Sequence, residues 1–212
     1  MKQFLAYFGY LLLLLNFILY VSAYFKNNKA YKIFTIYLFV MMCVQLSSHL
    51  CMRFYSNNLY LSHFYFIGQF IILSLFYLKL IKENFQRRVI AIGFVLVLST
   101  LSIQYVIRPE LFFKFNLYEI FITSFLLIIY ATFHFYNMLD EKKVFYFINM
   151  GILMYLFGST ILFLVGNLTA KFSLKFSFVT WILNTFLYAI YQLFILYEWI
   201  VNYYRKKQVL EN

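Results

Sequence analysis

Charged residues, glycine and proline are all scarce in this sequence. Of its 212 residues, 12% are charged, and there are six glycines and a single proline. No stretch of about 50 residues, the smallest usual size of a domain, is polar enough to fold in water as a kinase, nuclease, protease or cyclase. The sequence also lacks the glycine-rich loop that commonly holds phosphate groups. A fused soluble enzyme domain is therefore excluded.

Apolar side chains, in contrast, make up 65% of the residues, more than a water-soluble domain of this size can hide in its core. A membrane-spanning helix needs about 20 mostly apolar residues. Runs such as LLLLLNFILYV are continuously apolar and lack the alternation of barrel strands. We predict an all-α, polytopic membrane bundle of seven helices, a single domain over residues 1–212 with short loops and no soluble domain. The predicted helices are 3–24, 31–52, 60–81, 88–106, 112–136, 144–166 and 175–203.

The first predicted helix imitates a secretory signal, because Lys2 precedes a hydrophobic run and Val21-Ser22-Ala23 follows it. The run is nearer 20 residues than the roughly 7–15 of a signal core. Three lysines follow it, between positions 26 and 32. We therefore expect an uncleaved first helix and an intact mature chain of residues 1–212.

Positive charges are shared unevenly between the two sets of loops. With the N-terminus outside, the cytoplasmic connections and tail carry 12 Lys and Arg residues, and the outer side carries six. Short cytoplasmic loops are enriched in these residues. We expect a multi-pass protein of the inner (cytoplasmic) membrane with its N-terminus outside and its C-terminus in the cytoplasm. The net charge of +11 then indicates contact with membrane lipid headgroups rather than nucleic acid.

Several polar side chains fall in the outer half of this predicted bundle. At 1.5 Å per residue, Glu119 lies about 10 Å below the outer end of the fifth helix. An ionised carboxylate in hydrocarbon costs about 2.5–3.5 kcal/mol, so Glu119 should face the interior and pair with a histidine, either His49 or His63. Gln104 ends the fourth helix near the same surface. The further members at similar depth are Gln45, Ser47, Ser48, Gln69 and Asn184.

This cluster supports two interpretations. One is an outward-open pocket for a small ligand, with Glu119 at its floor. The ligand-binding residues would be Glu119, His49, His63, Gln45, Gln69 and Asn184. The other interpretation is a set of interhelical hydrogen bonds that only holds the helices together.

Three helices also carry residues that recur on one side. The spacing places Glu119, Thr123, Tyr130 and His134 on one face of the fifth helix, and Asn184, Tyr188, Tyr191, Glu198 and Asn202 on one face of the seventh. These faces could transmit a helix movement, relay protons or simply pack. In the sixth helix, Gly151, Tyr155 and Gly158 form a face for close helix approach.

The sequence offers little support for known membrane chemistry. The seventh helix has no lysine between Lys175 and Lys206 to form a retinal Schiff base. A zinc hydrolase would have to use His49, His63 and Glu119, but their spacing matches no zinc motif. We therefore expect no catalytic residues, no metal and no cofactor.

The last third of the chain is similar to a known group of proteins. The similarity rests on Tyr118-Glu119, on FYFINMGILMYLFGS with Asn149, Gly151, Tyr155 and Gly158, and on Trp181-Ile182-Leu183-Asn184. Over roughly residues 117–200 the chain resembles small seven-helix membrane proteins of Bacteroidota. Those proteins are mostly uncharacterised and are often encoded beside histidine kinases without a sensor domain of their own. The resemblance implies a sensory role with a histidine kinase as the cytoplasmic partner, and it carries over no catalytic residues.

Two classes of function follow from these observations. The first is a membrane sensor or receptor-like module that binds a small ligand from the outer side. It would signal to a separate cytoplasmic protein through the loops Lys79–Arg88 and Asp140–Lys143 or through the C-terminal tail. The second is a small integral-membrane enzyme that modifies lipid. A structural or assembly subunit of a membrane complex and a transporter are further alternatives. The sensor is the preferred hypothesis, and enzymatic activity is less expected.

The predicted orientation is testable with reporter fusions. Alkaline phosphatase, which is active only in the periplasm, should be inactive when fused after Asn212 and active when inserted between Arg108 and Lys114. A fluorescent protein that matures in the cytoplasm should give the reverse pattern. Phosphatase activity at the C-terminus would overturn the assignment.

Overall fold

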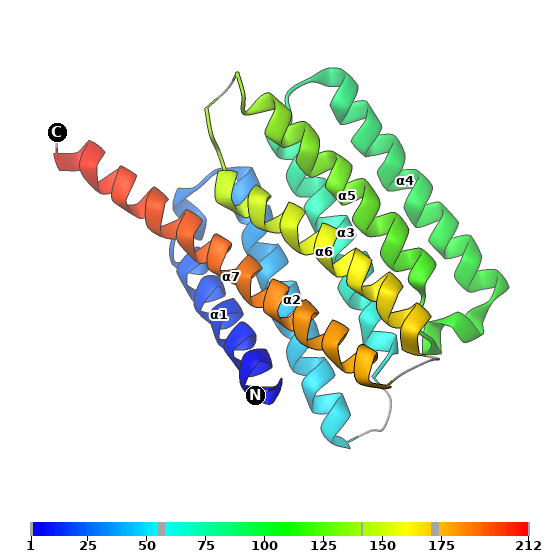
Figure 1. Cartoon of the computed structure of the whole chain (residues 1–212). Helices are drawn as coiled ribbons and strands as arrows, with labels where there is room; N and C mark the ends of the chain where they lie inside the picture. Colours follow the sequence, from blue (N-terminus) through cyan, green and yellow to red (C-terminus); the bar gives the residue numbers. More distant parts are fainter. Residues whose placement is uncertain (1, 55–57, 141, 171–173, 212) are drawn as a thin grey trace. The chain divides into compact units, whose positions relative to one another are not determined.

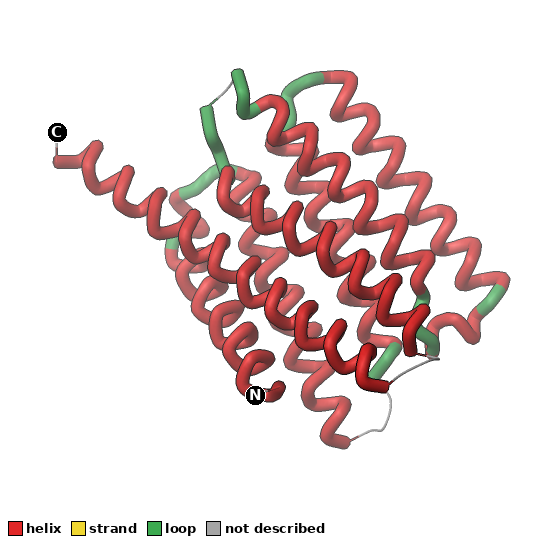
Figure 2. Tube along the Cα trace, viewed as in Figure 1, coloured by secondary structure: helices red, strands yellow, loops and turns green. Residues whose placement is uncertain are grey.

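The computed structural model describes residues 2–54, 58–140, 142–170 and 174–211, and all regular structure in these ranges is helical (Figure 2). The α-helices are α1 (Lys2–Ser22), α2 (Lys29–Phe54), α3 (Tyr60–Leu80), α4 (Asn84–Ile107), α5 (Leu117–Asn137), α6 (Tyr146–Ala170) and α7 (Leu174–Glu211). Two short 3-10 helices, η1 (Tyr24–Lys26) and η2 (Pro109–Phe113), lie in the connections. The predicted all-α architecture with seven helices is confirmed.

Each of these α-helices contains a segment long and apolar enough to cross a bilayer. The exposed side chains fit that solvent. On α4, Val95 and Leu96 are both 60% exposed. Water penalises such apolar surface by about 25 cal/mol per Å², whereas lipid tails accept it. The chain is a multi-pass integral membrane protein.

Helices α4 and α5 begin more than two residues away from the predicted positions, each for a local reason. Helix α4 begins at Asn84 rather than 88, since the Glu83 carboxylate accepts hydrogen bonds from the backbone N–H groups of Phe85 (3.0 Å) and Gln86 (2.5 Å). Helix α5 begins at Leu117 rather than 112, so Glu119 lies in its first turn, and the predicted depth of about 10 Å below the outer end of the helix is wrong. The preceding residues form η2, whose proline stands at its first position.

The helices group into two compact units, each described separately. The first, called here the α1–α6–α7 unit, comprises Met1–Tyr24 and Phe135–Asn212. In it, α6 and α7 run antiparallel beside each other (Figure 1), and α1 also packs on α7. Buried Asn16 on α1 donates from its side-chain nitrogen to the backbone oxygen (2.9 Å) and the side-chain oxygen (3.0 Å) of Gln192 on α7.

The small-residue face of α6 allows α7 to approach closely, as predicted. A Cβ atom at Gly151 would lie only 2.9 Å from the Cβ atom of Phe194 and from a ring carbon of Tyr191. Between the two glycines of this face, the Tyr155 ring stacks on the Tyr191 ring with centroids 5.4 Å apart. On α7, Tyr188, Tyr191 and Glu198 are buried, so the predicted polar face of this helix lies against protein over that length.

A carboxylate on α7 fixes the start of α6. Glu198 is buried, and its Oε2 atom accepts a hydrogen bond from the backbone N–H of Phe147 at 2.8 Å. Its Oε1 atom accepts one from the side-chain nitrogen of Asn202 at 2.9 Å. Phe145, just before α6, has a φ of 55°, a left-handed conformation that is costly for a bulky side chain. The chain therefore enters α6 through a strained residue that adjoins the capped first turn.

The second unit, called here the α2–α5 unit, is Phe25–His134. Helix α3 contributes the fully buried side chains Phe70, Leu73, Phe76 and Tyr77 to its core. The predicted polar face of α5, which is Glu119, Thr123, Tyr130 and His134, is at most 5% exposed throughout. The rings of Tyr77 and Tyr130 meet at 6.5 Å, and the Tyr130 hydroxyl donates to the Ile90 backbone oxygen at 3.4 Å. This face of α5 is therefore turned toward α3 and α4.

Substitution of Gly151 tests the close packing of α6 on α7. We expect Gly151→Ala to lower the free energy of unfolding by about 1–3 kcal/mol, because the new methyl group overlaps the Cβ atom of Phe194, which cannot rotate away. Gly68→Ala on α3 is the matched control, since its nearest side-chain atoms lie at 3.7 and 3.8 Å. Thermal unfolding in detergent compares the two variants. Equal melting temperatures would contradict the packing described here.

Candidate functional site

The α2–α5 unit contains a buried ion pair between α3 and α5. The Nδ1 atom of His63 lies 3.2 and 3.0 Å from the two carboxylate oxygens of Glu119. The two residues are 1% and 0% exposed. Of the two histidines that the sequence offered as partners for Glu119, His63 is the one that meets it, and His49 lies on α2 with an exposed side chain. The expectation that Glu119 faces inward and meets a histidine is confirmed.

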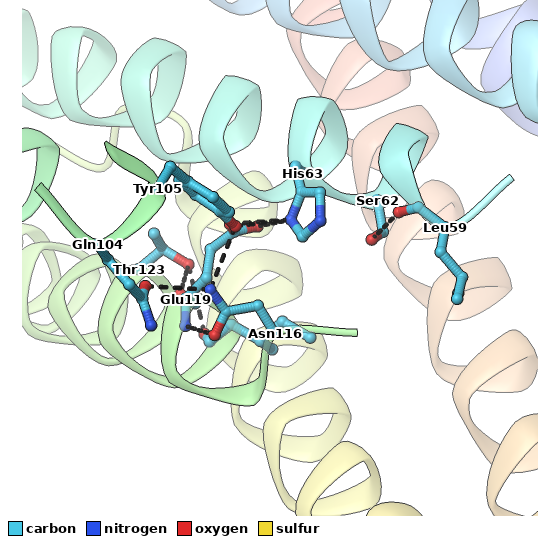
Figure 3. A network of polar contacts seen from close by, with 9 residues as sticks. Leu59, Ser62, His63, Gln104, Tyr105, Asn116, Glu119 and Thr123 are labelled. Carbon is cyan, nitrogen blue, oxygen red and sulfur yellow. Dashed lines mark hydrogen bonds and ion pairs between the residues drawn. The ribbon is translucent and has the colours of Figure 1, made fainter. Parts of the chain in front are cut away.

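A tyrosine from α4 completes this group. The Tyr105 hydroxyl donates a hydrogen bond to Oε2 of Glu119 and lies 2.9 Å from Nδ1 of His63 (Figure 3). Three groups that can carry a proton therefore lie within hydrogen-bond distance of one another, each from a different helix. We call His63, Tyr105 and Glu119 the acid–imidazole cluster.

Amide side chains hold the acid–imidazole cluster in place. Asn116 stands just before α5, and its side-chain oxygen accepts a hydrogen bond from the backbone N–H of Glu119 at 3.3 Å. Its side-chain nitrogen donates to Gln104 Oε1 at 3.1 Å and to the Tyr105 hydroxyl at 3.2 Å. Thr123 bonds back to the Glu119 carbonyl at 2.7 Å. The start of α5 and the end of α4 are thereby joined at the carboxylate (Figure 3).

The connection between α4 and α5 lies against the cluster. Phe112 of η2 stacks on the His63 ring, with centroids 5.4 Å apart and planes inclined by 26°. It also meets the Tyr105 ring edge-to-face at 6.1 Å. Backbone carbonyls of Phe112 and Lys114 lie near the imidazole, but its buried Nε2 atom makes no hydrogen bond to any described residue. One nitrogen of His63 is thus fully engaged, and the other is not.

The other predicted ligand-binding residues are distributed more widely. Gln69, two turns further along α3 than His63, is buried and donates to the Tyr37 hydroxyl at 3.1 Å. Gln45 is half-buried on α2. Asn184 belongs to the α1–α6–α7 unit, where it is half-buried. Ligand binding by any of the six residues stays a prediction.

Two members of the site were missed by sequence reasoning, although each had a signal. Asn116 stands three residues before Glu119, the spacing of a capping side chain and the acidic residue that follows it at a helix start. Tyr105 follows Gln104, which was placed in the outer cluster, but the large number of tyrosines in the chain hid it among interfacial candidates.

His63, Tyr105 and Glu119 are close enough to exchange a proton, and the Glu119 carboxylate is buried. Among the described residues, no three His, Cys, Asp or Glu side chains are grouped closely enough to hold a metal ion. The nearby Ser62 hydroxyl bonds to the Leu59 backbone oxygen at 2.5 Å, within its own turn. His63, Tyr105 and Glu119 can provide hydrogen bonding and proton transfer.

Comparisons with known proteins assign no family. No protein-family model, curated protein or solved structure matches this chain. The resemblance to the Bacteroidota proteins stays a prediction.

Removal of one member of the ion pair should reveal its contribution to stability. We expect His63→Leu to destabilise the protein by about 3 kcal/mol, because it leaves the Glu119 carboxylate buried without its ring partner. The double variant His63→Leu/Glu119→Leu should recover most of this loss, since no unpaired polar group remains. His49→Leu, at an exposed histidine, is the matched control. Thermal unfolding in detergent measures all four proteins, and a double variant no more stable than His63→Leu would refute the pairing.

Proposed function

We propose that the protein is a membrane sensor or receptor-like module that binds a small ligand from the outer side and signals to a separate cytoplasmic partner. The observation that carries the proposal is the acid–imidazole cluster, in which three helices and η2 meet at one buried carboxylate. An ionisable residue inside a membrane bundle is costly, and such residues commonly mark functional sites.

The acid–imidazole cluster couples the binding of a ligand at Glu119 to the positions of α3, α4 and α5. Every Glu119 carboxylate oxygen is already engaged by His63 or Tyr105. Because Glu119 is also 0% exposed, a ligand that bonds to it must first displace one of these side chains or move Phe112 away from the His63 ring. Either change alters the contacts that hold the ends of α3, α4 and α5 together. A ligand that prefers the altered contacts shifts the population of the two arrangements by its difference in affinity.

Helix α5 transmits a displacement at the acid–imidazole cluster to the other end of the α2–α5 unit. Its buried polar face runs from Glu119 to His134, 15 residues or about 22 Å along the helix. Near the far end, the His134 ring lies 6.2 Å from the ring of Tyr77 on α3. A displacement of α5 at Glu119 is thus carried by a helix that contacts α3 near both ends of this face, at His63 and at Tyr77.

The proposed orientation places the signal output in the cytoplasm of the cell. The excess of Lys and Arg supports an N-terminus outside, a C-terminus inside and residence in the inner membrane. Output would then pass through the loops Lys79–Arg88 and Asp140–Lys143 or the tail. The resemblance to the Bacteroidota proteins favours a histidine kinase without a sensor domain as the partner.

Replacement of Glu119 tests the sensor proposal in cells. A strain that lacks the protein is complemented with wild type, with Glu119→Gln or with Glu110→Gln, whose carboxylate is exposed on η2. We expect Glu119→Gln to change the transcriptional response of the strain at least severalfold, because the amide carries no charge to pair with His63 and places an NH₂ donor where Glu119 has an acceptor oxygen. Glu110→Gln should behave as wild type. Protein levels in the membrane are measured in parallel.

The same variants distinguish the alternatives. If the purified protein converts added phospholipid to a product, and Glu119→Gln abolishes that conversion, the protein is a lipid-modifying enzyme and the sensor proposal fails. If Glu119→Leu lowers the yield of folded protein and Glu119→Gln leaves the transcriptional response unchanged, Glu119 has only a structural role. Purification from native membranes, with identification of whatever molecule and protein remain bound, would name the ligand and the partner.

A further inference from the structure

The Nδ1 atom of His63 faces hydrogen-bond acceptors. The two Glu119 carboxylate oxygens lie 3.2 and 3.0 Å from it. The Tyr105 hydroxyl lies 2.9 Å from the same nitrogen. Because Tyr105 donates its own hydrogen to Glu119, its oxygen presents only lone pairs to the imidazole. Nδ1 must therefore carry a hydrogen and donate it.

The second ring nitrogen of His63, Nε2, points away from Glu119 (Figure 3). It is buried and makes no hydrogen bond to any described residue. The backbone carbonyls of Phe112 and Lys114, in and just after η2, lie near the imidazole. Carbonyl oxygens accept hydrogen bonds and cannot donate them. A hydrogen on Nε2 is therefore attracted by these carbonyls, whereas a bare lone pair is repelled.

The other titratable side chains around His63 do not compete for this role. On α2, which packs beside α3, His49 is exposed and Cys51 is half-buried. Glu119 is the charged side chain that meets the imidazole. The charged residues in and beside η2 all have exposed side chains, and they are Arg108, Glu110 and Lys114.

The burial of the acid–imidazole cluster favours the smallest ligand. His63 and Glu119 are 1% and 0% exposed, and Phe112 stacks on the imidazole. An organic ligand must open this packing before it binds, whereas a proton adds no volume. The cluster also lies at the ends of its helices, since His63 is three residues after the start of α3 and Tyr105 is two before the end of α4. The path of a proton from water is therefore short.

We propose that the ligand of the acid–imidazole cluster is a proton, which binds His63 and ties η2 to the helix ends. This inference rests on the sensor function proposed above and names its ligand. With the proton bound, the imidazolium donates from Nδ1 to Glu119 and from Nε2 toward the carbonyls of Phe112 and Lys114. When the proton leaves to water, either neutral form of the ring turns one nitrogen lone pair toward acceptor oxygens. Acid then favours η2 closed over His63, and base favours its release.

Hydrogen–deuterium exchange of the full chain in detergent measures the release of η2. The Leu111 and Lys114 amides donate to the backbone oxygens of Arg108 and Leu111, each at 3.1 Å, so their exchange reports opening of η2. After correction for the base catalysis of exchange itself, the rate should be at least about tenfold higher at about pH 9 than at about pH 5, the effect of one hydrogen bond to a charged group. A corrected rate that does not depend on pH would overturn the proposal.

Two histidine variants assign the effect to one residue. His63→Gln keeps a side chain that can donate to Glu119 but cannot titrate, so its corrected exchange rate should be the same at both pH values. His49→Gln removes an exposed histidine from α2 and should keep the pH dependence of wild type. A pH dependence that persists in His63→Gln would show that another group is responsible, and the proposal would fail.

The wild-type protein provides a measurement that does not depend on the folding of a variant. Solid-state NMR of the chain with ¹⁵N-labelled histidine distinguishes ring nitrogens that carry a hydrogen from those that do not. The His63 signals are identified by the contact of its ring with Phe112. Both nitrogens should carry hydrogen at the acidic end, and one should lose it in step with the opening of η2. An unchanged His63 ring over the whole range would refute proton binding.

Cells separate this inference from the sensor function on which it rests. The transcriptional response should follow external pH in strains with wild type or His49→Gln and ignore it with His63→Gln. If η2 of the purified protein ignores pH while Glu119→Gln still alters the transcriptional response, the ligand is not a proton and the sensor function stands. If η2 responds to pH but no strain does, the proton site stands and the sensor function fails.

Discussion

The interior of a bilayer contains no water to hydrogen-bond with a polar group, and this constraint governs the α2–α5 unit. A carboxylate there must be satisfied by other parts of the protein. Glu119 obtains an imidazole from α3 and a hydroxyl from α4, and the Asn116 side chain accepts a hydrogen bond from the backbone N–H of Glu119. Because these partners come from different helices, the helix ends are held in register by one side chain. Burial of the Glu119 carboxylate costs free energy unless partners from other helices bond to it. Its bonds therefore depend on the positions of those helices.

The same constraint acts in the α1–α6–α7 unit with a different result. Asn16 donates hydrogen bonds to Gln192 across α1 and α7, and Glu198 accepts one from an N–H group at the start of α6. These bonds are surrounded by close packing at Gly151 and by stacked tyrosine rings. Here each set of hydrogen bonds joins one pair of helices, whereas the three mutually bonded side chains of the acid–imidazole cluster come from three helices.

Hydropathy was sufficient to predict the seven helices, because each crossing needs a long apolar segment whatever its neighbours are. The polar face of α5 and the glycine face of α6 also followed from periodicity. The start of α5 did not, since it depends on the Asn116 side chain rather than on hydropathy. The choice of His63 over His49 depends on how each helix is rotated about its axis, which packing decides. Tyr105 was missed for the same reason. Residue spacing along α4 does not show which side of that helix faces α5.

The bond between Asn16 and Gln192 has a consequence for biogenesis. The two residues are 176 positions apart, so at about 5–20 residues per second the ribosome needs roughly 10–35 s to supply the second after the first. During that time α1 resides in the membrane without its final neighbour, and its asparagine must be tolerated by lipid or sheltered by the insertion machinery. Completion of this unit is therefore delayed until translation is nearly over, whereas Phe25–His134 can assemble while the ribosome is still at work.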